Sequence, residues 1–138
     1  MTTVRTASIC FVLVGLVPLV LGRLHPFRDA GLDASVQVGD PSRGRLAFEK
    51  RCTGCHSLTD NHEGPRLRGV YGRDSGSVSD YAYSPSLKNA GIVWDARSLD
   101  KWLTDPDALI PGNNMDFQVA EPVERRDLIA FLRQSSSK

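Results

Sequence analysis

The sequence has few residues of the kinds that form disulfides or bind metals. Among 138 residues there are three Cys, three His and two Met. A small, odd number of Cys excludes a framework of paired disulfides. An excess of charge of one sign is also lacking, because 17 basic residues are balanced by 16 acidic ones. Without a strong positive field, nucleic acid is not an expected partner.

Long hydrophobic runs are missing except for one near the N-terminus. Thirteen consecutive residues, Ile9–Leu21, carry no charge, and Arg5 precedes them. This pattern is typical of a secretory signal peptide, and the run is short for a membrane span, which needs about 20 apolar residues. No clear A-x-A cleavage site follows. Residues 1–22 are therefore interpreted as a signal peptide or an N-terminal membrane anchor, in which residues 7–22 would be the tether.

The rest of the chain has the composition of one globular domain. The whole sequence is 41% hydrophobic and 24% charged, which is ordinary for a folded protein. We assign residues 23–38 to a linker and residues 39–138 to the domain. A domain of about this size buries a limited share of its surface, so a bound apolar cofactor would help it to form a core.

Helix-start signals are frequent in the domain, whereas alternating strand-like runs are few. Asp or Ser followed by Pro is a strong start signal, because the first side chain caps the helix and Pro suits its first position. The sequence predicts an all-α fold whose C-terminal tail, Ser135–Lys138, is frayed. The expected helices begin at Pro41 (ending near Arg51), Pro85 (closed by Gly91), Asp95 (stopped by Pro106), Pro106 (ending near Ile110) and Pro122.

One motif carries the chemistry. Cys52-Thr53-Gly54-Cys55-His56 directly follows the first expected helix, and C-x-x-C-H is the attachment sequence of c-type haem. The two thiols add to the vinyl groups of the porphyrin, and the His ligates the iron. A redox dithiol would favour a βαβ context, and a zinc site needs four ligands. The remaining Cys, Cys10, lies in the leader, so we predict one haem c attached through Cys52 and Cys55.

A second iron ligand has few candidates. Met1 is the initiator, His25 lies in the linker, and His62 is only six residues beyond His56. Met115, in a Pro-Gly loop, is the Met that remains, although a Met alone is as often a core residue as a ligand. We predict that His56 and Met115 ligate the iron.

With these residues in place, residues 39–134 resemble a class I cytochrome c, of the mitochondrial type and of its bacterial soluble monohaem relatives. The resemblance implies four to five short helices wrapped around one covalently bound haem. The matching segments, in order, are Gly44–Phe48, Cys52–His56, Gly64–Arg73, Tyr81–Ser84, Gly91–Trp94, Ile110–Met115 and Arg126–Leu132.

The resemblance also implies a role for individual residues. The Pro65 carbonyl would accept a hydrogen bond from the second ring nitrogen of His56. Arg73, Tyr83 and Trp94 would donate to a haem propionate, which is costly to bury without donors. Where the terminal helices cross, Gly44 and Phe48 would pack against Leu128 and Phe131.

The sequence departs from the family at several positions near the expected haem. Trp102 replaces a Tyr whose hydroxyl reaches the Met sulfur in mitochondrial relatives. Leu87 and Asn113 replace an Asn and a Thr of a polar network. Asn114 replaces a Lys of the basic ring around the haem edge, and Asp105, Asp107 and Asp116 lie nearby.

The expected function is that of a single-electron carrier and not of an enzyme. Its partners would be transient redox proteins, a respiratory reductase and oxidase, and the carrier would be a monomer. Its expected location is the bacterial periplasm, either soluble or anchored to the outer face of the inner membrane. Two alternatives are a haem peroxidase or ligand-binding protein with a displaceable Met115, and a membrane-tethered relay subunit of a respiratory complex.

Overall fold

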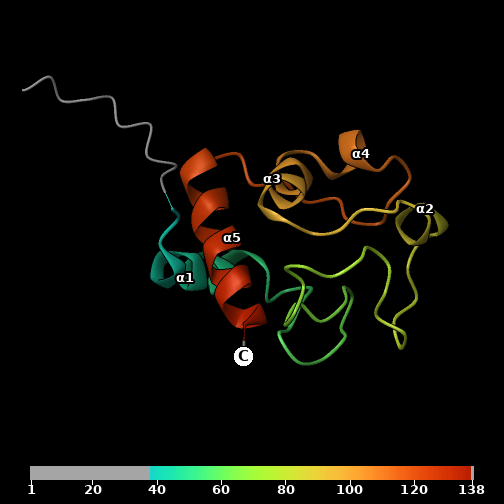
Figure 1. Cartoon of the computed structure of the whole chain (residues 1–138), viewed down its shortest axis with the longest axis horizontal. Coiled ribbons are helices and arrows are strands. Elements are labelled where there is room, and N and C mark those ends of the chain that lie inside the picture. The colour runs from blue at the N-terminus through green and yellow to red at the C-terminus, as the bar shows by residue number, and fades with distance from the viewer. Residues whose placement is uncertain (1–37, 138) are drawn as a thin grey trace, which may run out of the picture. The chain divides into compact units, whose positions relative to one another are not determined.

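The computed structural model describes residues 38–137, so the leader and nearly all of the expected linker lie outside the described residues. Within this range all regular structure is helical, apart from an isolated bridge between Asp74 and Val93. The prediction of an all-α fold is confirmed. The five helices, shown in Figure 1, are α1 (Pro41–Arg51), α2 (Pro85–Lys88), α3 (Ala96–Thr104), α4 (Pro106–Leu109) and α5 (Pro122–Ser136).

Side-chain caps explain where four of the helices begin. Asp40 accepts hydrogen bonds from the backbone amides of Ser42 and Arg43 at 2.8 and 3.3 Å. Asp95 forms a capping box with Ser98, because each side chain accepts from the other residue's amide. Ser84 and Asp105 cap α2 and α4 by accepting from the Leu87 and Ala108 amides, at 3.3 and 3.1 Å. These caps satisfy amides that have no partner inside the helix, which is why the start signals in the sequence are reliable.

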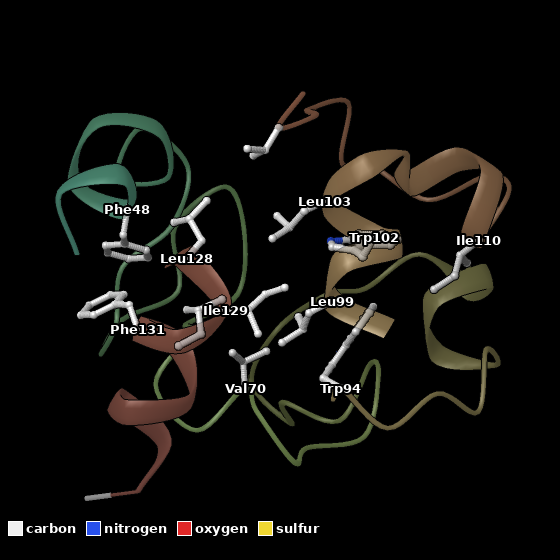
Figure 2. Packing of buried hydrophobic residues seen from close by; sticks show 12 residues of the cluster. Phe48, Val70, Trp94, Leu99, Trp102, Leu103, Ile110, Leu128, Ile129 and Phe131 are labelled. Atoms are coloured by element: carbon white, nitrogen blue, oxygen red, sulfur yellow. The ribbon is translucent and has the colours of Figure 1, made fainter. Parts of the chain in front are cut away.

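The first and last helices cross in close contact. Gly44 lies at the crossing, and a Cβ added there would stand 1.9 Å from the Asp127 carbonyl oxygen and 2.9 Å from the Phe131 Cβ. The rings of Phe48 and Phe131 pack with their centroids 5.3 Å apart (Figure 2). Only glycine allows the two backbones to approach this closely, so the expected packing of α1 on α5 is present.

A buried carboxylate joins the same two helices. Asp127 on α5 accepts from Arg43 Nε at 2.7 Å and from the Asp40 amide at 2.7 Å. Its side chain is only 6% exposed, and the hydrogen bond from Arg43 lowers the pKa of Asp127 below its usual value. The carboxylate therefore fixes the start of α1 against the middle of α5.

The hydrophobic core lies between α5 and α3. Leu128 and Val119 are almost completely buried, and Leu99, Trp102 and Leu103 cover the inner side of α3. Figure 2 shows Leu99 and Leu103 of α3 facing Leu128 and Ile129 of α5, with Trp94 and Trp102 farther from α5. Among residues 38–137, no helix is long and apolar enough to cross a membrane.

The C-terminal tail differs from the prediction. Ser135 and Ser136 belong to α5, which ends one residue before Ser137. Ser136 Oγ donates to the Leu132 carbonyl and accepts from the Tyr71 amide at 3.1 Å. The expectation of a frayed tail is wrong for these residues, because a loop 65 residues away supplies a hydrogen-bond partner.

α2 is also shorter than predicted. It ends at Lys88, and Asn89 forms the C-cap. Gly91, the residue expected to close the helix, lies beyond that cap with a φ of +63°. A residue without a Cβ is favoured in this left-handed conformation, so Gly91 turns the chain after the helix has ended.

The Asp127 contacts predict the acid sensitivity of the fold. Asp127→Asn should lower the free energy of unfolding at pH 7 by about 1–3 kcal/mol, because hydrogen bonds to a charged group are lost. A lowered pKa stabilises the fold fully above about pH 3.9, the ordinary value, and this stabilisation disappears as the pH falls through the folded pKa. The variant should therefore lose less stability on acidification, measured by urea unfolding from pH 7 to pH 3.

Asp74→Asn provides the control, since Asp74 is exposed and forms no ion pair among residues 38–137. Equal stability curves for Asp127→Asn and Asp74→Asn would contradict the structural role of Asp127.

Candidate functional site

A cavity of about 420 Å³ opens inside the fold, with predominantly apolar walls from the core. Leu67, Val70, Leu99, Leu103 and Leu128 form much of this apolar wall. The structure also brings all of the candidate site residues to the cavity, from five separate stretches of chain. These residues are Cys52, Cys55, His56, Pro65, Arg73, Tyr83, Trp94 and Met115.

The two cysteines are placed by the turn that ends α1. The Cys55 and His56 amides both donate to the Cys52 carbonyl, at 3.1 and 2.8 Å. This tight turn directs Cys52, Cys55 and His56 to one cavity. Burial raises the pKa of the Cys52 thiol to about 11, whereas Cys55 is exposed. Between residues 38 and 137 there is no cluster of three or more His, Cys, Asp or Glu side chains suited to a metal ion.

The imidazole of His56 is held from one side. Its Nδ1 lies 2.8 Å from the Pro65 carbonyl oxygen, and a carbonyl only accepts, so Nδ1 carries the proton and Nε2 is left with a free lone pair. Burial lowers the pKa of His56, which favours the neutral ring that metals require. The ring is therefore poised to ligate through Nε2.

Gly64 makes the close approach of this ring possible. A Cβ at position 64 would stand 2.1 Å from His56 Cε1, which is far inside a normal contact. The Gly64 amide also donates to the Cys55 carbonyl at 2.8 Å. Gly64 opens the sequence segment Gly64–Arg73, but no local pattern in the sequence indicates that it lies beneath the imidazole.

The sulfur of Met115 is held by an indole. Trp102 Nε1 donates to Met115 Sδ at 3.1 Å, so an indole N–H contacts the sulfur at the position where the resemblance implies a Tyr hydroxyl. The Met115 amide donates to Asn113 Oδ1 at 2.7 Å, and Asn113 Nδ2 donates to the Ile110 carbonyl at 3.0 Å. Asn113 thus shapes the Met115 loop through backbone contacts.

Polar groups gather at another part of the cavity wall. Arg73 donates to the carbonyls of Arg68 and Arg66 at 3.2 and 3.0 Å. Burial lowers the pKa of Arg73 and raises that of Tyr83. Trp94 is buried, with its ring centroid 5.3 Å from that of Trp102. This group of donors is suited to a carboxylate that enters the cavity.

The donor set fits a haem. Two thiols spaced for vinyl addition, a neutral imidazole and a thioether sulfur share one apolar cavity. Cys thioether attachment with His and Met ligation is the chemistry of c-type haem. Arg, Tyr and Trp supply the donors that a propionate needs when it leaves water. The fold and the site together define a small, all-α monohaem protein.

Comparison with known proteins identifies the family within this class. The cytochrome c family model matches residues 41–136. Cytochrome c of Theileria annulata is 44% identical over 110 residues, which cover 77% of this chain and 95% of that protein. Cytochrome c of Euglena viridis is 46% identical over 98 residues, covering 69% and 96%. Cytochrome cH from Methylobacterium extorquens has a similar structure, with a TM-score of 0.67 and 39% identity over 70% of this chain and 99% of that one.

The chain belongs to the cytochrome c family. It is an electron-transfer protein that binds haem c covalently, and Cys52 and Cys55 fit the attachment motif. Its redox partners are transient, as in cytochrome c generally. The predicted family, cofactor and non-enzymatic class are confirmed.

The Gly64 contact predicts the effect of a single added methyl group. Gly64→Ala should destabilise the haem-loaded protein by about 1–3 kcal/mol, because the overpacked imidazole or its loop must move. The shift should appear in urea unfolding, together with a changed absorption spectrum. Gly54→Ala is the matched control, because a Cβ at position 54 meets nothing within 4 Å. The same loss in both variants would contradict the role assigned to Gly64.

Proposed function

We propose that this cytochrome c carries single electrons between a respiratory reductase and oxidase, with its haem iron ligated by His56 Nε2 and Met115 Sδ. The observation that carries the proposal is the lining of one cavity by both side chains together with Cys52 and Cys55. When bound, the haem supplies an iron that takes up and releases one electron.

Other residues of this chain orient the two side chains that would ligate the iron. Pro65 accepts from His56 Nδ1 at 2.8 Å, so the ring keeps one tautomer and one orientation. Trp102 occupies one lone pair of the Met115 sulfur with its N–H and leaves another free. Ligands that are oriented in advance need little rearrangement when the charge of the site changes.

The polar part of the cavity is proposed to bind a haem propionate through Arg73, Tyr83 and Trp94. All three line the cavity, and the Arg73 guanidinium is half-buried. A charged donor in a region of low dielectric binds a carboxylate more strongly than it does in water. These residues would therefore contribute to the stability of the bound haem and to its reduction potential.

Ligation by both His56 and Met115 would leave the iron no open position for a substrate, which favours electron transfer over a peroxidase or gas-binding function. The Met115 loop is held by Asn113 and Trp102, which disfavours displacement of the sulfur. Binding of carbon monoxide at neutral pH without denaturant would instead support the ligand-binding alternative.

The N-terminal part of the chain lies outside the described residues and is assigned from its sequence. Residues 1–22 are proposed to be a signal peptide that exports the chain to a bacterial periplasm. Residues 23–38 would link this leader to a monomeric haem domain at residues 39–138. If the leader is not cleaved, residues 7–22 would tether the domain to the outer face of the inner membrane, as in a relay subunit.

The proposed ligand set predicts the properties of Met115→Ala. This variant should lose the weak near-infrared sulfur-to-iron band. Its reduction potential should decrease, by less than the range of about 0.8 V over which the iron ligands of haem proteins set the potential. The potential falls because Met ligation favours the reduced iron. Gln118→Ala, an exposed residue three positions on, is the control. A wild-type protein without the near-infrared band would show that Met115 is not the ligand.

The proposed leader predicts the mass and location of the mature protein. In a bacterial host that attaches haem c, the mature chain should lack about 22 N-terminal residues and appear in the periplasmic fraction without detergent. Intact mass would report the haem adduct and the mature start together. A full-length chain released only by detergent would support the tether instead.

A further inference from the structure

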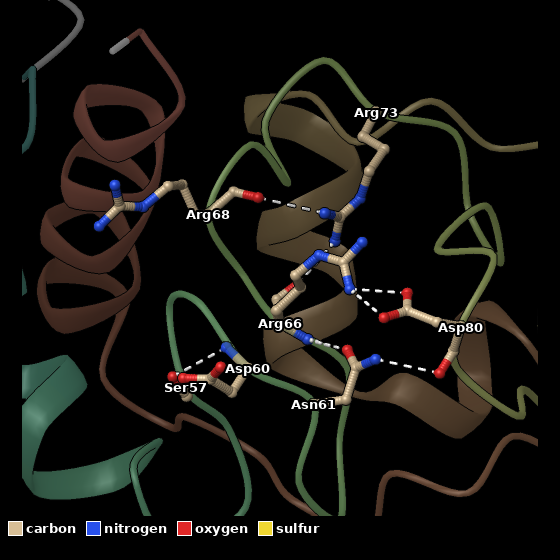
Figure 3. A network of polar contacts seen from close by, with 7 residues as sticks. All are labelled: Ser57, Asp60, Asn61, Arg66, Arg68, Arg73 and Asp80. Atoms are coloured by element: carbon tan, nitrogen blue, oxygen red, sulfur yellow. Dashed lines mark hydrogen bonds and ion pairs between the residues drawn. The ribbon is translucent and has the colours of Figure 1, made fainter.

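A second arginine lies behind Arg73 at the polar part of the cavity. Arg66 NH1 donates to both carboxylate oxygens of Asp80, at 2.7 and 2.8 Å (Figure 3). The Arg66 side chain is 34% exposed, and it is not part of the cavity wall. Its backbone carbonyl accepts from Arg73 NH2 at 3.0 Å. Arg66 is therefore placed to act on the cavity through Arg73.

The backbone around this ion pair is held independently of the charges. Asn61 Nδ2 donates to the Asp80 carbonyl at 3.1 Å, and Asn61 Oδ1 accepts from the Arg66 amide at 3.0 Å. The Tyr81 hydroxyl donates to the Glu63 carbonyl nearby. Because the Asn61 contacts use backbone atoms of Arg66 and Asp80, they survive a change of either side chain.

The charges at this place do not balance. The guanidinium groups of Arg66 and Arg73 lie close to each other (Figure 3), and the charge of Arg66 adds to burial in lowering the pKa of Arg73. Asp80 pairs with Arg66, whereas Arg73 donates to carbonyls and forms no ion pair among residues 38–137. Of these three charged groups, Arg73 is the one left without a carboxylate partner in the described part of the chain, and it is therefore suited to bind a carboxylate in the cavity.

We propose that Arg66 is a positioning residue of the propionate site, and that its charge, partly neutralised by Asp80, tunes the reduction potential of the haem. The inference rests on the proposed binding of a propionate by Arg73 and Tyr83. A positive charge near the haem disfavours the oxidised, more positive iron and raises the potential. The negative charge of Asp80 opposes this effect and lowers the potential. The reduction potential therefore depends on both charges of the ion pair and not on Arg66 alone.

The test compares two substitutions of opposite charge. Arg66→Gln removes a positive charge and should lower the midpoint potential, whereas Asp80→Asn removes a negative charge and should raise it. The potentials of the haem-loaded proteins are measured by spectroelectrochemical titration at one pH and low ionic strength, because salt screens exposed charges. The double variant should lie between the two single variants.

A different result is expected if the Arg66–Asp80 ion pair only holds the loop in place and its charges do not act on the haem. Loosening the loop by either substitution would admit water to the haem and lower the potential in both variants, because solvent stabilises the oxidised iron. Potentials that shift in the same direction would therefore overturn the proposal. If Arg66→Gln does not fold, Asp80→Asn alone decides, because charge predicts a rise and a loosened loop predicts a fall.

Arg68→Gln is the matched control, with the same change of charge two residues further along. Its side chain is exposed and points away from Arg66 and Arg73 (Figure 3), so its shift should be clearly smaller. An Arg66→Gln shift no larger than that of Arg68→Gln would also overturn the proposal. Arg73→Gln separates the proposed propionate site from the proposed role of Arg66. If Arg73→Gln leaves the potential unchanged, the propionate assignment fails. If Arg73→Gln shifts the potential and Arg66→Gln does not, only the role of Arg66 fails.

Discussion

The hydrogen bond from His56 Nδ1 to the Pro65 carbonyl is the interaction on which the site depends. It fixes the tautomer of the ring, so Nε2 carries the lone pair that an iron needs. Gly64 allows the contact, because any side chain there would meet the ring at 2.1 Å. The segment that follows Pro65 carries Arg66 and Arg73, so the position of the imidazole and that of the polar donors are linked through one stretch of backbone.

The helices hold the segment from Gly64 to Arg73 in place, so that it faces the opposite wall of the cavity. α1 ends in the turn that bears Cys52, and α5 crosses α1 where Gly44 and the buried Asp127 hold the two together. α3 presents Trp102 to the Met115 sulfur from the other side. Burial therefore serves two purposes in this protein: it stabilises the helices, and it provides the low-dielectric surroundings in which a redox-active iron is sensitive to nearby charges.

Charge is distributed unevenly around this apolar site. Arg73 lies at the polar part of the wall and Arg66 lies behind it, with Asp80 as the neutralising partner of Arg66. Asn114 and Asp116, the residues on either side of Met115, also line the cavity. A negative charge therefore lies beside the proposed methionine ligand, and the positive charges lie at the polar part of the cavity.

Local signals in the sequence determined the helices and the haem motif, because caps such as Asp40 and Asp95 and the spacing of Cys52, Cys55 and His56 act over a few residues. Resemblance to a family supplied the residues that now line one cavity, without their contacts. Only the tertiary structure decided that Trp102 meets the Met115 sulfur, that Gly64 lies under the imidazole and that Ser136 extends α5. It also decided the partners of Asp127 and Arg66. These contacts join side chains that are separated along the chain, and no local pattern specifies which distant groups meet when the core forms.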